Sequence, residues 1–272
     1  MTTVQGHPTP DRRLPIRGIL LDIEGTTSSV SFVYDVMFPY VRKHLTFEVL
    51  TNWDEPDFIA AHEAIARDAG HDSLAAWLQT HRLRRDNPLR AADVVCREVI
   101  RQMDADLKAT GLKRLQGLIW QSGFESGELL AHVYEDVPLA LEAWNAAGKD
   151  VRIYSSGSVQ AQKLFFGHTI AGNLLGHIRG HYDTTIGPKK EAASYIQIAA
   201  DFSLPTGEIL FLSDIVAELD AARAAGLETA LVVRPGNAPG QTSAGAPHAQ
   251  IAGFSQLEID QARQSIPGLL DT

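Results

Sequence analysis

Ile16-Arg-Gly-Ile-Leu-Leu-Asp-Ile-Glu-Gly-Thr-Thr27 is the stretch of sequence that decides the fold. Its first half is a short apolar run that ends at Asp22, and Gly25-Thr26-Thr27 then marks a turn. Near-continuous apolar runs are typical of strands in a parallel sheet, because helices cover both faces of such a sheet. We therefore predict a buried strand that ends at Asp22.

The chain alternates between helical and strand patterns again after Val137. Strand patterns are found at 151–154, 208–212 and 229–233. Helical patterns at 139–147, 159–166, 191–200 and 216–225 separate or follow them. Alternation at this spacing predicts βαβ units, and therefore an α/β fold built on a parallel sheet.

The region between the first strand and this alternating part has a different pattern. Apolar residues recur at three- and four-residue spacing in 58–66, 74–83, 91–103 and 112–120, which indicates amphipathic helices. We predict an inserted helical cap domain at 31–135. The catalytic core would comprise 14–30 and 136–260, preceded by a flexible tail at 1–13.

The overall composition narrows the class of protein. Of 272 residues, 44% are hydrophobic and 21% are charged, as in ordinary globular proteins. The net charge of −9 argues against a nucleic-acid partner, which usually needs a basic surface. Cys96 is the single cysteine, so no intrachain disulfide can form. No apolar run reaches the roughly 18 residues of a membrane span, and the N-terminal stretch lacks the apolar segment of a signal peptide. We expect a cytoplasmic protein with no membrane partner.

Polar side chains follow three of the predicted strands. Asp22 ends the first strand, Ser155 and Ser156 end the second, and Asp214 follows the strand at 208–212. Lys189 comes after Gly187-Pro188, where we expect a helix to open. Ligands of open parallel sheets bind at the carboxyl ends of the strands, so these side chains are predicted to converge at one edge.

These residue types suit the cleavage of a phosphate ester. Asp22 could attack phosphorus, and Glu24 could protonate the leaving oxygen and later activate water. Asp22 and Asp214 could hold Mg²⁺, which prefers carboxylate and water oxygens.

The remaining candidates could bind the phosphoryl group. Ser155 and Ser156 offer hydroxyl and backbone N–H donors for its oxygens. Lys189 could hold the phosphate and lower the pKa of the nucleophile.

The motif 22–27 resembles the first motif of the haloacid-dehalogenase superfamily, with Glu24 in place of the usual second aspartate. Ser155, Lys189 and Asp214 fall in the order of its other motifs. The chain is more closely similar to the enolase-phosphatases of methionine salvage. The stretches that carry this likeness are Leu20-Leu-Asp-Ile-Glu-Gly-Thr-Thr27, Leu115-Gln-Gly117, Ile153-Tyr-Ser-Ser-Gly-Ser158, Ala161-Gln-Lys-Leu164, Phe166-Gly-His168, Ile209-Leu-Phe-Leu-Ser-Asp214 and Val232-Val-Arg-Pro-Gly-Asn237.

The resemblance implies a Rossmann-like core with a helical cap, in a monomer that binds one Mg²⁺. It implies a small-molecule phosphate ester as substrate, 2,3-diketo-5-methylthiopentyl 1-phosphate. This ester would be enolised and then dephosphorylated to an acireductone through an aspartyl-phosphate. By the same likeness, Asp22, Glu24 and Asp214 are metal positions, with Glu24 contributing its backbone carbonyl. Ser155, Ser156 and Lys189 are substrate positions.

Structural explanations compete with these functional ones. Asp22 could cap a helix, and Ser155 and Ser156 could cap the helix that starts near Ser158. Lys189 beside Lys190 could belong to a solvated surface.

Other questions stay open at the level of sequence. Glu218 could support the metal site or be an ordinary helix carboxylate, and the enolisation base could be Glu24 or Lys189. Trp77, Trp120 and Phe124 fit the core of the cap or contacts to a methylthio tail. The alternative functions are another phosphatase of the same superfamily, or a binding module without catalytic activity.

Overall fold

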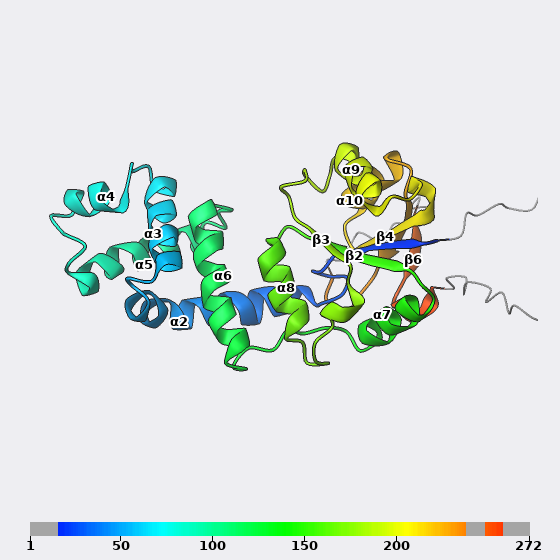
Figure 1. Ribbon diagram of the computed structural model, residues 1–272, viewed down its shortest axis with the longest axis horizontal. Helices are drawn as coiled ribbons and strands as arrows, with labels where there is room; N and C mark the ends of the chain where they lie inside the picture. The colour runs from blue at the N-terminus through cyan, green and yellow to red at the C-terminus, as the bar shows by residue number, and fades with distance from the viewer. Residues whose placement is uncertain (1–15, 238–247, 258–272) are drawn as a thin grey trace, which may run out of the picture.

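The computed structural model describes residues 16–237 and 248–257 (Figure 1). The tail expected at 1–13 lies outside the described residues, as do 14–15, 238–247 and 258–260 of the expected core.

One parallel sheet lies at one end of the molecule, at the right of Figure 1. Within the described residues it has six strands in the order β3-β2-β1-β4-β5-β6, and every neighbouring pair is parallel. The strands are β1 (Gly18–Leu21), β2 (Asp150–Tyr154), β3 (Gly180–Tyr182), β4 (Ile209–Ser213), β5 (Glu228–Val232) and β6 (Ala249–Ile251). The predicted α/β fold with a parallel core sheet is confirmed.

Both faces of β1 are buried, which explains its continuous apolar sequence. Ile19 and Leu21 pack into one hydrophobic cluster together with residues of α7 and α8. Leu20 points to the opposite face, into a second cluster with residues of α9 and α10. These helices are α7 (Asp136–Ala146), α8 (Val159–Gly167), α9 (Ala192–Phe202) and α10 (Val216–Ala224).

The strand register brings three chain segments to the same edge of the sheet. Leu21 is paired with Ile153 of β2 on one side and with Leu212 of β4 on the other. The backbone N–H of Asp22 continues this ladder by donating to the Leu212 carbonyl at 3.0 Å. The residues that follow β1, β2 and β4 therefore leave the sheet next to one another.

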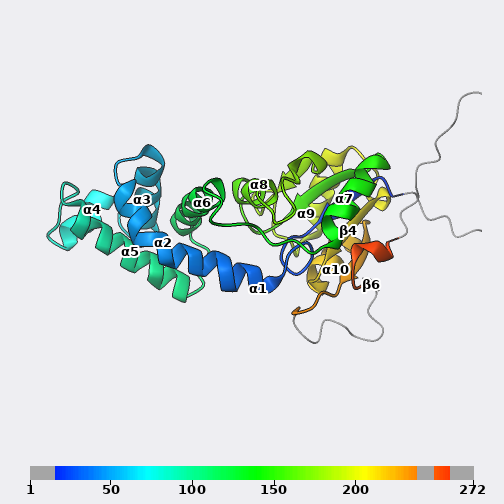
Figure 2. The ribbon, with the colours of Figure 1, turned by 90° about the horizontal axis from the view of Figure 1, so that it is seen from below.

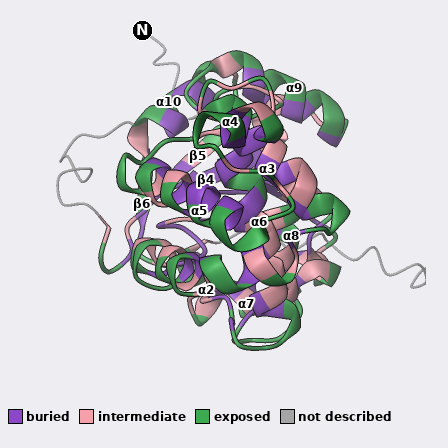
Figure 3. Cartoon of the chain, turned by 90° about the vertical axis from the view of Figure 1, so that its left-hand side faces the viewer, coloured by how far each residue is buried: buried purple, intermediate pink, exposed green. Residues whose placement is uncertain are grey.

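Helices between β1 and α7 extend away from the sheet (Figures 1 and 2), while Phe32, Met37 and Phe124 of this segment still pack into the cluster on the sheet. They are α1 (Val30–Phe32), a π-helix (Val33–Met37), α2 (Phe38–Thr51), α3 (Pro56–Asp68), α4 (Leu74–Thr80), α5 (Pro88–Asp104) and α6 (Thr110–Glu125). They have their own buried cluster, to which α2 contributes Val41 and Leu45. Figure 3 views this end and shows exposed residues on the outside of the helices with buried residues between them.

Several elements differ from the sequence analysis. The patterns did not identify α2, nor β3 and β6, each of which has three residues. Lys189 does not open a helix, because α9 begins at Ala192 with Glu191 as its N-cap residue. No helix in 16–237 or 248–257 is long and apolar enough to cross a membrane.

Candidate active site

Asp22 and Lys189 form a buried ion pair at the carboxyl edge of the sheet. Lys189 Nζ donates to Asp22 Oδ1 at 2.7 Å and to Glu218 Oε2 at 2.6 Å. The side chains of Asp22, Lys189 and Glu218 are 6, 9 and 10% exposed, so water screens these contacts little. Asp22 therefore does not cap a helix, and Lys189 does not belong to a solvated surface.

The two acidic neighbours keep Lys189 charged. Burial by itself lowers the pKa of an ammonium group, but the charges of Asp22 and Glu218 outweigh it, and the pKa of Lys189 is raised. Ser213 Oγ also donates to Glu218 Oε2 at 3.1 Å. Glu218 is thus a partner of Lys189 rather than a solvated helix carboxylate.

Asp214 reaches the same place from the end of β4. Its carboxylate lies directly against Gly25, where a Cβ atom would be 2.2 Å from Asp214 Oδ2. Burial, with repulsion from Asp22 and then from Glu218, raises the pKa of Asp214 to about 7. Lys189 alone therefore does not balance the negative charge of Asp22, Asp214 and Glu218.

The donor set fits a hard divalent cation. No three His, Cys, Asp or Glu side chains within the described residues converge as a ready metal cluster. Mg²⁺ does not need one, because it usually retains several waters and takes one or two carboxylates from the protein. Asp22 and Asp214 provide these, and a divalent charge would relieve the repulsion that raises the pKa of Asp214.

The loop after Asp22 sets the direction of Glu24. The N–H of Gly25 donates to the Ser28 carbonyl at 2.8 Å. Because the peptide group is planar and trans, this bond aims the Glu24 carbonyl in the opposite direction. The side chain of Glu24 is half-buried, and burial followed by repulsion from Asp22 raises the pKa of its carboxyl. Such a group retains its proton more readily than an exposed glutamate, as an acid catalyst requires.

Ser155 and Ser156 follow β2 and line a pocket with Glu24. They do not cap α8, because the N-cap residue is Ser158, whose Oγ accepts a hydrogen bond from Ala161 N at 3.2 Å. Ser155 Oγ accepts a bond of 3.4 Å from Gly157 N. The hydroxyl groups of both serines thus stay available for a ligand in the pocket.

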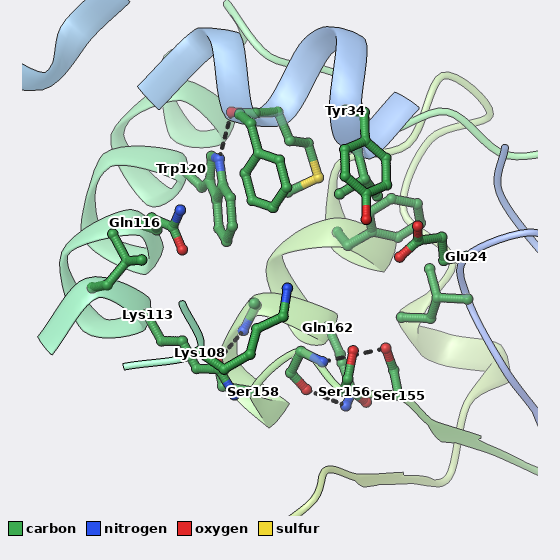
Figure 4. Close-up of a pocket in the computed structure, with 18 of the residues that line it drawn as sticks. Glu24, Tyr34, Lys108, Lys113, Gln116, Trp120, Ser155, Ser156, Ser158 and Gln162 are labelled. Carbon is green, nitrogen blue, oxygen red and sulfur yellow. Dashed lines mark hydrogen bonds between the residues drawn. The ribbon is translucent and has the colours of Figure 1, made fainter. Parts of the chain in front are cut away.

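The pocket has a volume of about 430 Å³ and lies between the sheet edge and the inserted helices. Figure 4 shows Glu24 on one side, Ser155 and Ser156 along the bottom, and Lys108 and Trp120 on the opposite side. Much of the wall is apolar; its apolar members are Ile23, Val33, Met37, Phe38, Met103, Leu107, Leu112, Trp120, Ala161 and Phe165.

Asp22, Lys189 and Asp214 do not line this pocket. They are only 4, 9 and 6% exposed. Asp22 and Asp214 follow β1 and β4, Lys189 lies in the loop between β3 and α9, and the charges of Asp22 and Lys189 act on the pocket side chain of Glu24. A phosphate ester would thus place its phosphoryl end at Asp22 and the rest of the molecule in the pocket.

Of the aromatic residues and the cysteine considered above, only Trp120 lines the pocket, and the others are buried in hydrophobic clusters. Trp77 lies in the core of the inserted helices, and Phe124 packs into the cluster on one face of the sheet. Trp120 lines the pocket, with its indole N–H donating to the Met37 carbonyl at 3.0 Å. Cys96 is buried, and burial raises the pKa of its thiol to about 11.

The structure adds three candidate functional residues that the sequence analysis did not predict: Lys108, Arg234 and Asn237. Lys108 follows α5, lines the pocket and opposes the rise in the pKa of Glu24. Arg234 Nε donates to the Thr26 carbonyl at 3.0 Å, and Asn237 Nδ2 donates to the Gly25 carbonyl at 2.9 Å. Arg234 and Asn237 belong to the quoted stretch 232–237, which carried the resemblance but gave no reason for these residues.

Comparisons with known proteins identify the family of this chain. A family model described as haloacid dehalogenase-like hydrolase matches residues 16–226. Enolase-phosphatase E1 of Pseudomonas aeruginosa is 47% identical over 223 residues, which are 82% of this chain and 83% of that protein. Enolase-phosphatase E1 of Drosophila pseudoobscura is 44% identical over 257 residues, covering 93% and 98% of the two chains. The crystal structure of the UTR4 protein of Saccharomyces cerevisiae superposes with a TM-score of 0.69 at 32% identity, covering 89% of this chain and all of that one. The chain therefore belongs to the haloacid dehalogenase-like hydrolases and, within them, to the enolase-phosphatases.

Proposed function

We propose that this protein enolises and then dephosphorylates 2,3-diketo-5-methylthiopentyl 1-phosphate to an acireductone, as a step of methionine salvage. The observation that carries the proposal is the similarity to proteins named Enolase-phosphatase E1 over most of the chain. The arrangement of Asp22, Lys189 and Asp214 beside an apolar pocket supports it, because this ester combines a phosphoryl group with an apolar methylthio tail.

The phosphatase half uses two carboxyl groups. Asp22 attacks phosphorus and forms an aspartyl-phosphate, while Glu24 donates its proton to the departing oxygen. Glu24 then takes a proton from water, and that water attacks phosphorus, which frees Asp22 and releases phosphate. Mg²⁺, held by Asp22, Asp214 and the Glu24 carbonyl, would neutralise charge on the transferring group.

The contacts of Glu24 and Lys189 favour one of these two candidates as the enolisation base. The ammonium of Lys189 is already bound to two carboxylates, and its side chain does not line the pocket. Glu24 does line the pocket. We assign to Glu24 the removal of the proton from the carbon next to the carbonyl. This leaves its carboxyl protonated, which is the form that the departing oxygen later needs.

The test is a turnover assay on the diketone phosphate with and without Mg²⁺, in which phosphate release and ultraviolet absorbance of the enol are followed together. We expect transient absorbance, then phosphate, and neither product with Asp22→Asn plus Glu24→Gln. Phosphate release from other small esters only would favour another phosphatase of the family. Absence of turnover on any ester would favour a binding module.

Further assignments rest on the resemblance. We propose a cytoplasmic monomer with one Mg²⁺, in which residues 31–135 form a cap over a core of 14–30 and 136–260. The separate hydrophobic cluster of the inserted helices supports this division. Such a cap would exclude water during phosphoryl transfer.

A further inference from the structure

Hydrogen bonds within the loop itself hold much of the backbone from Asp22 to Ser28. The Ile23 carbonyl accepts from the N–H groups of Thr26, Thr27 and Ser28 at 3.2, 2.9 and 2.9 Å. Ile23 N donates to Asp22 Oδ1 at 2.8 Å, so the nucleophile side chain is tied to the same turn. These bonds leave the carbonyls of Gly25 and Thr26 without a partner within the loop.

Two side chains from the segment after β5 bind those two carbonyls. Asn237 Nδ2 donates to the Gly25 carbonyl at 2.9 Å, and to the Val232 carbonyl at 3.3 Å. Arg234 Nε donates to the Thr26 carbonyl at 3.0 Å. Consecutive carbonyls of the loop are thus held by residues that are distant in the sequence.

Arg234 is itself held by an ion pair and by two aromatic rings. Its Nη1 donates to Asp136 Oδ2 at 2.9 Å, and its side chain is 5% exposed. Its guanidinium lies over the rings of Tyr134 and Phe254, with centroid distances of 4.4 and 4.8 Å. Because the guanidinium is held by these contacts, it can fix the position of the Thr26 carbonyl relative to the end of β5.

We propose that Asn237 and Arg234 are positioning residues, which hold the Gly25 and Thr26 carbonyls and so keep Glu24 aligned with Asp22. Gly25 is the critical point, because it touches the Asp214 carboxylate on one side and is bound by Asn237 on the other. The Gly25 carbonyl belongs to the peptide group after Gly25, and the Glu24 carbonyl belongs to the one before it. The two groups share the Gly25 Cα atom, so a shift of the Gly25 carbonyl would displace the backbone of Glu24 and with it the Glu24 side chain. This inference rests on the proposed function and extends it to residues that do not touch the substrate.

The predicted effect falls on kcat and on the requirement for Mg²⁺. Asn237 and Arg234 do not line the pocket and do not bind the side chain of Lys189, so KM should change little. Loss of a residue that orients catalytic ligands typically lowers activity or metal affinity by about 10–100-fold.

The experiment compares Asn237→Ala, Asn237→Asp, Arg234→Lys and Gln256→Ala in the full chain with the diketone phosphate over a range of Mg²⁺ concentrations. Gln256 is the matched control, because its Oε1 accepts from Ala252 N at 2.7 Å and so supports the same C-terminal region without touching the loop. Asn237→Asp replaces the donor with an acceptor that faces the Gly25 carbonyl, so it should be worse than Asn237→Ala. Thermal unfolding of each variant reports any loss of fold.

We expect Asn237→Ala and Arg234→Lys to lose about tenfold or more in kcat, with KM within twofold and a higher Mg²⁺ requirement. Gln256→Ala should retain wild-type kinetics. If both loop variants keep wild-type kcat and Mg²⁺ requirement and only unfold at lower temperature, the two residues are structural and the inference is overturned. Asp22→Asn separates this outcome from failure of the proposed function, because an active Asp22→Asn protein would refute the covalent mechanism itself.

Discussion

Gly25→Ala should inactivate the enzyme through a contact of the new methyl group with Asp214. Gly25 has φ +72°, a left-handed conformation that costs a residue with a Cβ atom about 1–2 kcal/mol. The Cβ atom would lie 2.2 Å from Asp214 Oδ2, whereas ordinary contacts begin at 3.4 Å. Either the loop or the carboxylate must therefore move by about 1 Å, and a misplacement of about 1 Å can lower turnover by roughly 100-fold.

Gly70→Ala is the matched control for the backbone term. Gly70 has φ +86°, but no atom lies within 4 Å of the place that a Cβ atom would occupy. Both variants should thus lose about 1–2 kcal/mol of unfolding free energy from the backbone, measured by urea denaturation. Only Gly25→Ala should lose about 100-fold in kcat and bind Mg²⁺ more weakly. A Gly25→Ala protein with the kcat of Gly70→Ala would refute the close approach of Asp214 to the loop.

Three further variants test other parts of the molecule. Lys189→Met leaves Asp22 and Glu218 buried without their ammonium, so urea denaturation should show a loss of about 3–5 kcal/mol, and a loss below about 1 kcal/mol would contradict the buried ion pairs. Burial lowers the pKa of His62 from 6.5 to about 4. Between those pH values His62 is therefore protonated in the unfolded chain and neutral in the folded chain. The contribution of the neutral His62 to the free energy of unfolding is therefore fully present above pH 6.5 and is lost as the pH drops towards 4. In urea denaturation, the wild-type protein should lose about 3 kcal/mol more than His62→Met over this range. Equal losses in the two proteins would contradict the lowered pKa of His62. Trp120→Ala should raise KM for the diketone phosphate by roughly tenfold and leave kcat on a short phosphate ester unchanged. An equal effect on both esters would show that Trp120 does not bind the methylthio tail.

The sequence predicted the elements whose patterns are local. β1 is apolar because both of its faces are buried, and that pattern can be read directly along the chain. β3 has three residues and lies at an edge of the sheet, so it carries too little periodicity to identify. In α2, Glu48 is buried among apolar neighbours, which blurs the expected stripe.

The candidate site divides in the same way. Asp22 and Asp214 could be placed together because the register of a parallel sheet follows from its topology. The choice of Glu218 as the partner of Lys189 depends on side-chain contacts between separate elements, and no sequence pattern specifies these. Arg234 and Asn237 donate hydrogen bonds to loop carbonyls, and bonds to backbone atoms do not require any particular side chains in the bonded loop.

The position of the pocket explains how one site can carry out two reactions. Asp22 and Asp214, which we propose for phosphoryl transfer, are buried at the ends of β1 and β4, where the sheet fixes them. Most of the apolar wall comes from the inserted helices, which have their own core and can vary in sequence without disturbing the strand ends. Glu24 is the group that both parts share, since it follows β1 by three residues and also faces the pocket. In the proposed mechanism, a carbon acid in the pocket and a phosphoryl group at Asp22 would therefore meet the same carboxyl, which would accept a proton in the first reaction and donate one in the second.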